Sequence, residues 1–278
     1  MEWAFLCLEG GHFWGSTESS WVESSIKRYG PKGIESVVDM VADEEPLQIT
    51  VDGFPVAVVM RTPGDDLDLV SGFLLTEGFL AHLDQVSRID LEHKENHALV
   101  FLAEGVEFDQ AKLSRNLFSA SSCGICGKAS IESIRQHYAA VPKGFQIGSE
   151  LLLTFPDQLR KAQESFAKTG GIHAAALFDV SGQLLVLRED VGRHNAIDKA
   201  IGWAAEKGID CSQTVLQVSG RVSFEVMQKA LAAAIPVVSA ISAPSSLAVE
   251  FAQESNQTLI GFLRPPTFNI YSGPDRLS

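Results

Sequence analysis

Residues 214–242 read TVLQVSGRVSFEVMQKALAAAIPVVSAIS, and they alternate an apolar strand, a helix and a second apolar strand. Nearly continuous apolar strands are typical of a sheet that is covered on both faces, and a helix between two of them is typical of a parallel crossover. The alternation begins upstream at residues 172–179 and ends at residues 258–264. The sequence therefore predicts an α/β fold with a largely buried sheet and helices on its faces.

The chain before residue 120 has a different pattern. Residues 47–60 contain two β-rich runs around Asp52-Gly53, which is a strong hairpin signal. Residues 62–79 read as a helix that Thr62 can cap and Gly78 can end. A second hairpin is expected across residues 86–102. This smaller part is thus predicted to be a hairpin-rich α+β unit.

We divide the chain into four parts on these patterns. Residues 1–33 show no sustained period and are expected to form an N-terminal arm, and residues 34–120 form the α+β part. Residues 121–142 hold two cysteines and a predicted helix over 127–142. The remaining residues, 143–278, form the α/β part, which includes a further helix over 157–168 and is expected to bind a cofactor.

Composition and charge exclude several classes of function. The 278-residue chain has 22 Lys and Arg residues against 35 Asp and Glu residues, so its formal charge is −13. This balance argues against non-specific nucleic-acid binding, and any anionic ligand must be held by a local cluster of donors. No apolar run approaches the ~18 residues of a membrane span, and the start of the chain lacks the basic segment of a secretory signal. We expect a cytoplasmic protein that does not associate with membranes.

The segment SSCGICGKAS at residues 121–130 contains a CxxC pair, Cys123 and Cys126. By itself the pair permits three interpretations: half of a metal site, a redox pair, or a place where sulfur itself is handled. A complete local zinc or iron–sulfur ligand set is missing, because the cysteine pair is single and only His137 follows closely. No permanently bound metal is therefore expected.

Cys123 is predicted to be the more reactive thiol of the pair. It lies where a Gly-rich loop enters a predicted helix, and Lys128 falls in the first turn of that helix. Unpaired backbone N–H groups, the helix dipole and a nearby cation all favour a thiolate. A lowered pKa would make Cys123 a nucleophile at neutral pH.

The segment GIHAAAL at residues 171–177 resembles part of a deaminase motif that has lost its chemistry. Zinc-dependent nucleobase deaminases use His-x-Glu followed by Pro-Cys-x-x-Cys, and the Glu shuttles protons. Here Ala175 stands where that Glu is needed, and the CxxC precedes His173 instead of following it. The chain is not expected to deaminate nucleosides.

Three junctions after predicted strands carry Ser, Gly and Arg residues. They are SGR at 219–221, SAPSS at 242–246 and FLRPPT at 262–267, and they add to the anion site expected at GRHN, residues 192–195, where a strand leads into a helix. In open α/β sheets ligands bind outside the carboxyl ends of the strands, and helix N-termini there favour anions. No GxGxxG or Walker pattern is present. The junctions together predict a site for a phosphate-bearing ligand.

Taken in order, the segments resemble the FdhD (FdhD/NarQ) family of formate dehydrogenase accessory sulfurtransferases. The resemblance covers roughly residues 34–275. The segments that carry it are EEPLQITVDGFPVAVVMRTPGDDLDLVSGFLLTEGF, SSCGICGKAS, TGGIHAAALFD, REDVGRHNAIDK, SGRVSFEVMQKA, SAPSSLAVE and GFLRPPTFNIY. One departure is Ile172, where the family pattern leads us to expect a threonine.

The resemblance implies a fold and an activity. The fold would be a cytidine deaminase-like mixed sheet with helices on both faces, usually in a homodimer. The protein would accept sulfur from a cysteine desulfurase as a persulfide on Cys123, with Cys126 expelling or resolving it. It would deliver the sulfur to the molybdenum (or tungsten) bis-guanine-dinucleotide cofactor before insertion into formate dehydrogenase.

The resemblance also implies where the cofactor binds. It places the cofactor contact on Phe262, Leu263, Arg264, Pro265, Pro266 and Thr267. The junction residues expected to surround it are Arg193, His194, Asp198, Ser219, Gly220 and Arg221. The arginines suit pyrophosphate oxygens, His194 or Phe262 suits stacking on guanine, and Asp198, or else Asp190, suits the guanine N–H groups.

Two other classes of function remain open at this point. A dithiol oxidoreductase would cycle Cys123 and Cys126 as a disulfide and would need no cofactor site. A metal-binding cofactor-chaperone module would bind a metal through the cysteines without moving sulfur. Metal analysis and persulfide detection separate these alternatives from a sulfur carrier.

Overall fold

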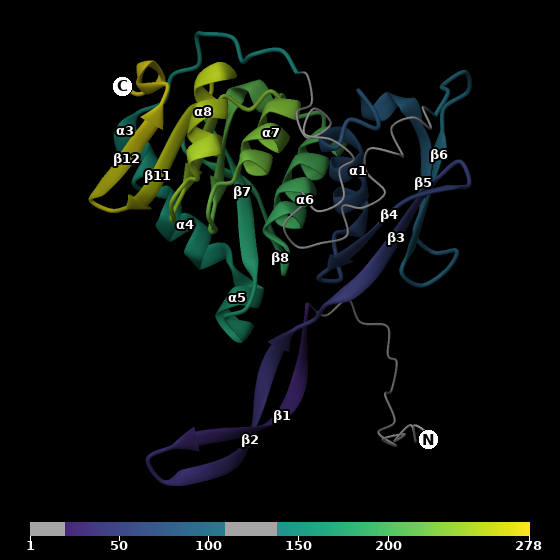
Figure 1. The fold of residues 1–278 in the computed structure, drawn as a ribbon, viewed down its shortest axis with the longest axis vertical. Helices are drawn as coiled ribbons and strands as arrows, with labels where there is room; N and C mark the ends of the chain where they lie inside the picture. The colour runs from purple at the N-terminus through teal and green to yellow at the C-terminus, as the bar shows by residue number, and fades with distance from the viewer. Residues whose placement is uncertain (1–19, 109–137) are drawn as a thin grey trace.

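The computed structural model describes residues 20–108 and 138–278. Three sheets organise them: a two-stranded hairpin β1-β2, a four-stranded sheet in the order β4-β3-β6-β5, and a six-stranded sheet in the order β12-β11-β10-β9-β7-β8. Figure 1 shows the two larger sheets side by side with helices α1 and α6 between them. Within these residues, no helix is long and apolar enough to cross a membrane.

Residues 21–42 form a long hairpin. Strand β1 covers Trp21–Gly30 and pairs antiparallel with β2, Gly33–Ala42. The predicted division at residue 33 therefore falls between two paired strands. The sequence signal is weak because polar and apolar side chains share both faces of this hairpin, so no clean period of two appears.

The four-stranded sheet confirms both predicted hairpins. Strand β3 (Glu45–Val51) pairs with β4 (Phe54–Arg61) around Asp52-Gly53, and β5 (Val86–Asp90) pairs with β6 (His97–Leu102). The central pair, β3 and β6, is parallel. A short 3₁₀ helix, Leu83–Gln85, leads into β5. Apolar residues of this sheet and of α1 form one core.

Helix α1 is shorter than predicted and covers Asp66–Thr76. The prediction that Thr62 caps it is wrong, because Asp65 holds the N-cap position. Thr62 is instead committed to the other sheet: its N–H donates to Asp190 Oδ2 at 3.1 Å, and its hydroxyl accepts from the Val191 N–H. The hydrogen bonds of Thr62 to residues of the other sheet thus take the place of a capping bond to α1.

The six-stranded sheet is mixed, as expected. Its strands are β7 (His173–Asp179), β8 (Leu184–Asp190), β9 (Thr214–Val218), β10 (Val237–Ala240), β11 (Thr258–Arg264) and β12 (Thr267–Ser272). Strands β9, β10 and β11 are parallel, whereas β7 runs antiparallel to β8 and β9, and β12 antiparallel to β11. The sequence prediction stopped at β11 and missed β12.

Helices cover both faces of this sheet, which confirms that expectation. One face carries α6 (Arg193–Glu206), α7 (Phe224–Ala232) and α8 (Ser246–Glu254), and the other carries α3 (Ser149–Leu152), α4 (Phe155–Ala162) and α5 (Glu164–Thr169). Alternation along β7 serves both cores: Ala175 and Leu177 pack with α6 to α8, while Phe178 packs with α3 and α4. Short 3₁₀ helices cover Cys211–Gln213 and Pro274–Arg276.

Two predicted helices differ from the structure. The helix expected over 157–168 is two helices, α4 and α5, which are separated at the extended residue Gln163. Most of the helix expected over 127–142 lies outside the described residues, but residues 138–142 are described and are not helical. The backbone of Val141 bonds instead to the end of α8, because its N–H donates to Ser255 and its carbonyl accepts from Asn256.

Helices α1 and α6 cross at unusually close range. A Cβ atom at Gly72 of α1 would lie 1.8 Å from the Asp198 carbonyl oxygen, and a Cβ at Gly202 of α6 would lie 1.9 Å from the Asp68 carbonyl oxygen. Glycine at both positions is what lets the two backbones touch. This contact joins the α+β part to the six-stranded sheet.

Candidate functional site

One edge of the six-stranded sheet gathers most of the predicted cofactor-binding residues. Because β8, β9, β10 and β11 run in one direction, and β7 and β12 in the other, the carboxyl ends of the first four meet the amino ends of the last two. This is the edge where open α/β sheets bind ligands. We call it the ligand edge; its residues are His173, Gly192–Asn195, Ser219–Arg221, Ser242–Ser245 and Phe262–Thr267.

His173, Arg193 and Gly220 form the centre of the ligand edge. A Cβ atom at Gly220 would lie 3.3 Å from His173 Nδ1 and 3.8 Å from Arg193 Cδ. Ser219 fixes this junction to β7, because its N–H donates to the Ala174 carbonyl at 3.0 Å and its hydroxyl accepts from the Ala174 N–H at 2.9 Å. Because Gly220 has no side chain, its backbone can lie close to both the His173 imidazole and the Arg193 side chain.

The N-terminus of α6 presents unpaired donors to this centre. Its N-cap is Gly192, which makes no side-chain capping bond. The turn is held from below by Asp190, whose Oδ1 accepts from the Gly192 N–H at 2.8 Å and from Asn195 Nδ2 at 2.9 Å. Arg193 Nε is buried and has no hydrogen-bond partner among the described residues. The combination suits an anion.

The two histidines of the ligand edge are held neutral. Burial lowers the pKa of His173, and the cations Arg193 and Arg221 lower it further. Burial also lowers the pKa of His194, to about 2, with Arg193 and Lys229 contributing. A neutral imidazole can both donate and accept a hydrogen bond, so these rings are suited to polar groups of a ligand rather than to holding charge.

The His194 ring is directed toward the start of α7. Its Nε2 lies 3.4 Å from Ser223 Oγ and 3.5 Å from Glu225 Oε2, and both the His194 and Glu225 side chains are almost buried. The sequence analysis did not single out Ser223 or Glu225. Their signal is modest, because a serine followed by a glutamate at a helix start is equally typical of ordinary capping.

The carboxyl end of β11 forms a second part of the ligand edge. Phe262 has a φ of +51° and leaves 38% of its side chain exposed. Its N–H donates to the Ser242 carbonyl at 3.0 Å, and Arg264 Nε donates to the Ile241 carbonyl at 3.0 Å. The Arg264 guanidinium lies 5.8 Å from the centre of the Phe262 ring. An exposed aromatic ring beside an arginine is suited to a heterocycle that carries phosphate.

The remaining residues of this segment divide between core and surface. Leu263 is fully buried and packs with α3 and α4, whereas Pro265, Pro266 and Thr267 are exposed in the turn to β12. Leu263 therefore supports the turn from below. Contact of Pro265, Pro266 and Thr267 with a ligand stays a prediction.

Backbone hydrogen bonds connect the two parts of the ligand edge. The Val222 N–H donates to the Ala243 carbonyl, the Ser245 N–H donates to the Val222 carbonyl, and the Ile241 N–H donates to the Val218 carbonyl. The structure thus brings Arg193, His194, Ser219, Gly220 and Arg221 onto the same edge as residues 262–267.

Asp198 does not lie on the ligand edge. It follows His194 by one turn, but its carboxylate faces away into the core, where Oδ1 accepts from Thr76 Oγ1 at 2.7 Å and Oδ2 lies 2.9 Å from Lys229 Nζ. The geometry therefore does not support Asp198 as an acceptor for guanine. Asp190 is also fully buried, and burial raises its pKa.

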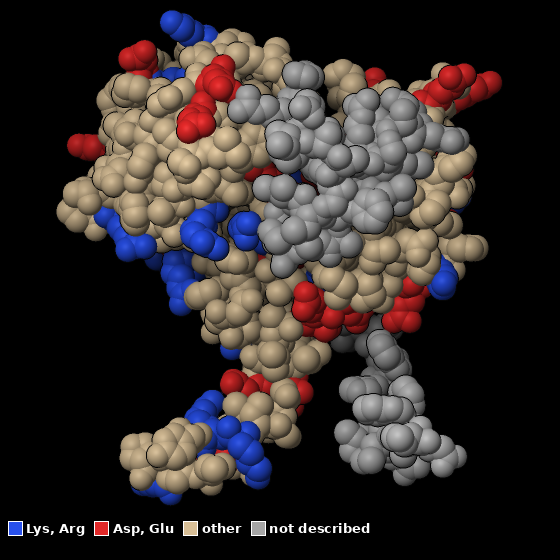
Figure 2. Space-filling view, in the orientation of Figure 1, with Lys and Arg blue, Asp and Glu red and all other residues tan. Residues whose placement is uncertain are grey.

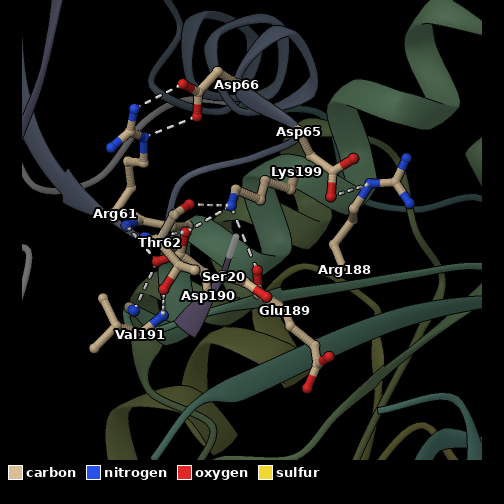
Figure 3. Close-up of polar contacts among 12 residues, drawn as sticks. Ser20, Arg61, Thr62, Asp65, Asp66, Arg188, Glu189, Asp190, Val191 and Lys199 are labelled. Carbon is tan, nitrogen blue, oxygen red and sulfur yellow. Dashed lines mark hydrogen bonds and ion pairs between the residues drawn. The ribbon is translucent and has the colours of Figure 1, made fainter. Parts of the chain in front are cut away.

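Asp190 serves instead in a polar cluster that joins the two larger sheets. Figure 3 shows Lys199 between Thr62 and Asp190: its Nζ donates to the Thr62 carbonyl at 2.8 Å and lies 2.9 Å from Asp190 Oδ2. Nearby, Arg188 on β8 forms an ion pair with Asp65 at 3.4 Å. These contacts fix α1 and β4 against the base of the ligand edge.

Cys123 and Cys126 lie outside the described residues, so the structure does not place them. Cys211 is described, and burial raises the pKa of its thiol to about 12. A thiol of that kind is not a nucleophile at neutral pH. Within residues 20–108 and 138–278, no three His, Cys, Asp or Glu side chains form a group that could hold a metal ion.

Known proteins that are similar to this chain share one name. The sulfur carrier protein FdhD of Mycobacterium tuberculosis is 48% identical over 254 residues, which cover 86% of this chain and 92% of the relative. The protein of the same name from Sulfolobus acidocaldarius is 43% identical over 241 residues, covering 86% of this chain and 91% of the relative.

A solved structure has the same fold. The crystal structure of a protein proposed to be a formate dehydrogenase accessory protein, from Desulfotalea psychrophila, superposes with a TM-score of 0.76. The likeness covers 94% of this chain and 100% of that chain at 21% identity, so it shows the fold alone. The model of the FdhD/NarQ family matches residues 42–278. The chain therefore belongs to the FdhD/NarQ family.

Proposed function

We propose that this protein carries sulfur for a formate dehydrogenase. It accepts sulfur from a cysteine desulfurase as a persulfide on Cys123 and transfers it to the molybdenum (or tungsten) bis-guanine-dinucleotide cofactor before the cofactor enters the enzyme. The observation that carries the proposal is the family match, because residues 42–278 include the CxxC pair and the whole ligand edge. The name that the curated relatives share, sulfur carrier protein FdhD, supports the same activity.

The first step is a thiol exchange that conserves atoms and electrons. The Cys123 thiolate attacks the outer sulfur of the desulfurase persulfide, the bond to the desulfurase sulfur breaks, and the desulfurase thiolate leaves. The product is a Cys123 persulfide. Glycine at position 124 and the glycine and serine residues around the pair are suited to a loop that must reach two partners in turn.

The second step needs two electrons, which the CxxC pair can supply. The Cys126 thiolate attacks Sγ of the Cys123 persulfide, a disulfide forms between the two cysteines, and hydrosulfide leaves for the cofactor metal. The outer sulfur is reduced to sulfide as the two thiolates are oxidised to the disulfide. A cellular dithiol reductant then restores the pair.

The ligand edge provides a place for the cofactor while sulfur arrives. The cofactor is a polyanion and the chain carries a formal charge of −13, so binding requires focused donors. Arg193 and Arg221 both help to lower the pKa of His173 at the centre of the edge, and Arg264 lies beside Phe262 at its other end. Guanidinium groups bind pyrophosphate oxygens in a bidentate manner, and the uncapped start of α6 adds N–H donors.

Sulfur loading tests the proposal directly. The purified protein is incubated with a cysteine desulfurase and cysteine, and its intact mass is measured with and without a thiol reductant. We expect a gain of one sulfur atom, lost on reduction, in the wild type and in the matched control Cys211→Ser. Cys123→Ala should not gain sulfur and should abolish client dehydrogenase activity, whereas Cys126→Ala should load but impair the client. Equal loading of Cys123→Ala would disprove the assignment.

A further inference from the structure

Hydrogen bonds fasten Thr62, the residue after strand β4, to the start of helix α6. The Thr62 N–H donates to Asp190 Oδ2 at 3.1 Å, and its hydroxyl accepts from the Val191 N–H at 3.1 Å. Its carbonyl accepts from Lys199 Nζ at 2.8 Å. Figure 3 shows these contacts, and Thr62 itself is only 1% exposed. Every polar group of Thr62 is thus bonded to the region in which α6 begins.

Asn195 makes a second link between the same two segments. Its Nδ2 donates to the Met60 carbonyl at 2.7 Å and to Asp190 Oδ1 at 2.9 Å. The amide lies against the N-cap of α6, because a Cβ atom at Gly192 would lie 2.8 Å from Asn195 Nδ2. Glycine at the N-cap therefore leaves the room that the Asn195 amide needs to reach both acceptors.

The two links lie on either side of the group that is best placed to bind an anion. Val191 and Asn195 bracket Arg193 along the chain, and Arg193 Nε is buried without a hydrogen-bond partner among the described residues. In addition, the N-cap Gly192 makes no side-chain capping bond. The backbone that carries these anion donors is therefore held on both sides by residues 60–62 of the α+β part.

The joint between the α+β part and the six-stranded sheet has other contacts, and they lie elsewhere. Helices α1 and α6 cross at close range, and Ser71 Oγ of α1 donates to Glu206 Oε1 at 2.7 Å. Glu206 is the last residue of α6, at the opposite end of the helix from Arg193. The bonds of Thr62 and Asn195 differ from these contacts in lying beside the anion donors.

We propose that Thr62 and Asn195 are positioning residues for the anion donors at the start of α6, so that the α+β part determines how tightly the ligand edge binds a diphosphate. This inference rests on the proposed cofactor site. Thr62 is too deeply buried to touch a ligand and acts through the turn that carries Arg193. Binding groups that are held in place before the ligand arrives lose less freedom when it binds.

Inorganic pyrophosphate tests the proposal, with calorimetry as the measure of its affinity. Thr62→Val keeps the shape and the backbone groups of residue 62 but removes the hydroxyl, so the Val191 N–H loses its acceptor. We expect pyrophosphate to bind about tenfold more weakly to this variant. Thr62→Ser restores the hydroxyl and should bind pyrophosphate as the wild type does, which a loss of packing alone would not predict.

Ser71→Ala is the matched control. Ser71 is fully buried, and its variant also removes one hydroxyl hydrogen bond between the α+β part and α6, but at the far end of the helix. Urea titration should show a loss of stability in both Thr62→Val and Ser71→Ala, whereas only Thr62→Val should bind pyrophosphate more weakly. An unchanged affinity in Thr62→Val, or an equal loss of affinity in Ser71→Ala, would overturn the proposal.

Hydrogen exchange locates the effect within the protein. The Gly192 N–H donates to Asp190 Oδ1, and the Ala196 N–H donates to the Gly192 carbonyl, so both amides report on the first turn of α6. In Thr62→Val without ligand these amides should exchange faster than in the wild type, while the amides of β9 should be unaffected. Exchange at Gly192 and Ala196 that stays at the wild-type rate would contradict a positioning role.

The wild type separates this inference from the proposed function. If it loads sulfur on Cys123 and binds pyrophosphate, and Thr62→Val binds pyrophosphate equally well, only the positioning role is disproved. If the wild type binds neither pyrophosphate nor GDP, the proposed cofactor site fails and the positioning role fails with it.

Discussion

Lys229 Nζ lies 2.9 Å from Asp198 Oδ2, and both side chains are about 2% exposed. The same ammonium lies 2.8 Å from Glu77 Oε1 and donates to Thr76 Oγ1 at 3.0 Å. Lys229 belongs to α7, Asp198 to α6, and Thr76 ends α1, so one buried cation joins helices from both larger sheets. Burial lowers the pKa of Lys229, but the surrounding carboxylates, Asp198 first among them, outweigh burial and raise the pKa, so the side chain stays protonated.

Removal of this cation should be costly. In Lys229→Met the carboxylates of Asp198 and Glu77 stay buried without their partner, and breaking a buried pair in this way costs about 3–5 kcal/mol. We expect a loss of that size in the free energy of unfolding from urea titration. The matched control Lys207→Met, at the exposed end of α6, should lie within about 0.5 kcal/mol of the wild type. A similar loss in both variants would show that the ion pair is not responsible.

The crossing of α1 and α6 predicts a steric effect. In Gly202→Ala the new methyl group would lie 1.9 Å from the Asp68 carbonyl oxygen, and backbone atoms cannot rotate away. The helices must separate, which costs about 1–3 kcal/mol or more as overpacking. Gly148→Ala is the control, because its nearest side-chain atom is at 3.8 Å. Thermal unfolding should show a lowered Tm for Gly202→Ala, and an unchanged Tm would contradict the close crossing.

The neutral state of His194 predicts a dependence of stability on pH. Its folded-state pKa of about 2 lies below the usual 6.5 of the unfolded chain, so acidification puts a proton on the unfolded state first. Stability is complete above pH 6.5 and falls as the pH decreases below it, by about 2 kcal/mol at pH 5. His194→Gln should lose less stability than the wild type between pH 7 and pH 5 in urea titrations. Equal slopes would show that His194 is protonated in the folded protein.

The sequence predicts the elements of the α/β part well because each strand there is buried on both faces. A run such as Val215, Leu216 and Val218 carries a strong signal, and Gly or Pro residues bound most of the helices. The hairpin β1-β2 was missed for the opposite reason: it is largely exposed, and apolar and charged residues occur on both of its faces, so no alternation of apolar and polar residues appears along its strands. Helix α1 was misjudged at its start because Thr62 has a partner 128 residues away in Asp190.

The sequence could predict those residues of the ligand edge that are brought together by the order and direction of the strands alone. Arg193 and Gly220 follow strands and Arg264 is the last residue of one, and parallel strands bring such strand ends together. Asp198 was misplaced because helical spacing relates it to His194 but does not tell which way the shared face turns. Lys229, a lone lysine in an apolar helix, was the available signal for a buried anion nearby.

Arg221 allows the proposed cofactor site to be tested apart from sulfur transfer. It is exposed at the junction after β9 and contributes to the lowered pKa of His173. GDP serves as a fragment of the cofactor, and calorimetry measures its affinity. We expect Arg221→Ala to weaken GDP binding by about 1.5–3 kcal/mol, the scale of a charge-assisted contact. Arg88→Ala, on the other sheet, should have no effect.

ADP completes the test of Arg221, because it shares the diphosphate of GDP but not the base. If the Arg221 guanidinium binds phosphate oxygens, its removal should weaken the binding of both nucleotides equally. The losses of binding free energy in Arg221→Ala should therefore agree for GDP and ADP within about 0.5 kcal/mol. Sulfur loading on Cys123 should be unchanged in this variant, since loading precedes cofactor contact. A loss with GDP alone would mean that Arg221 reads the base, and no loss with either nucleotide would remove the diphosphate from this part of the ligand edge.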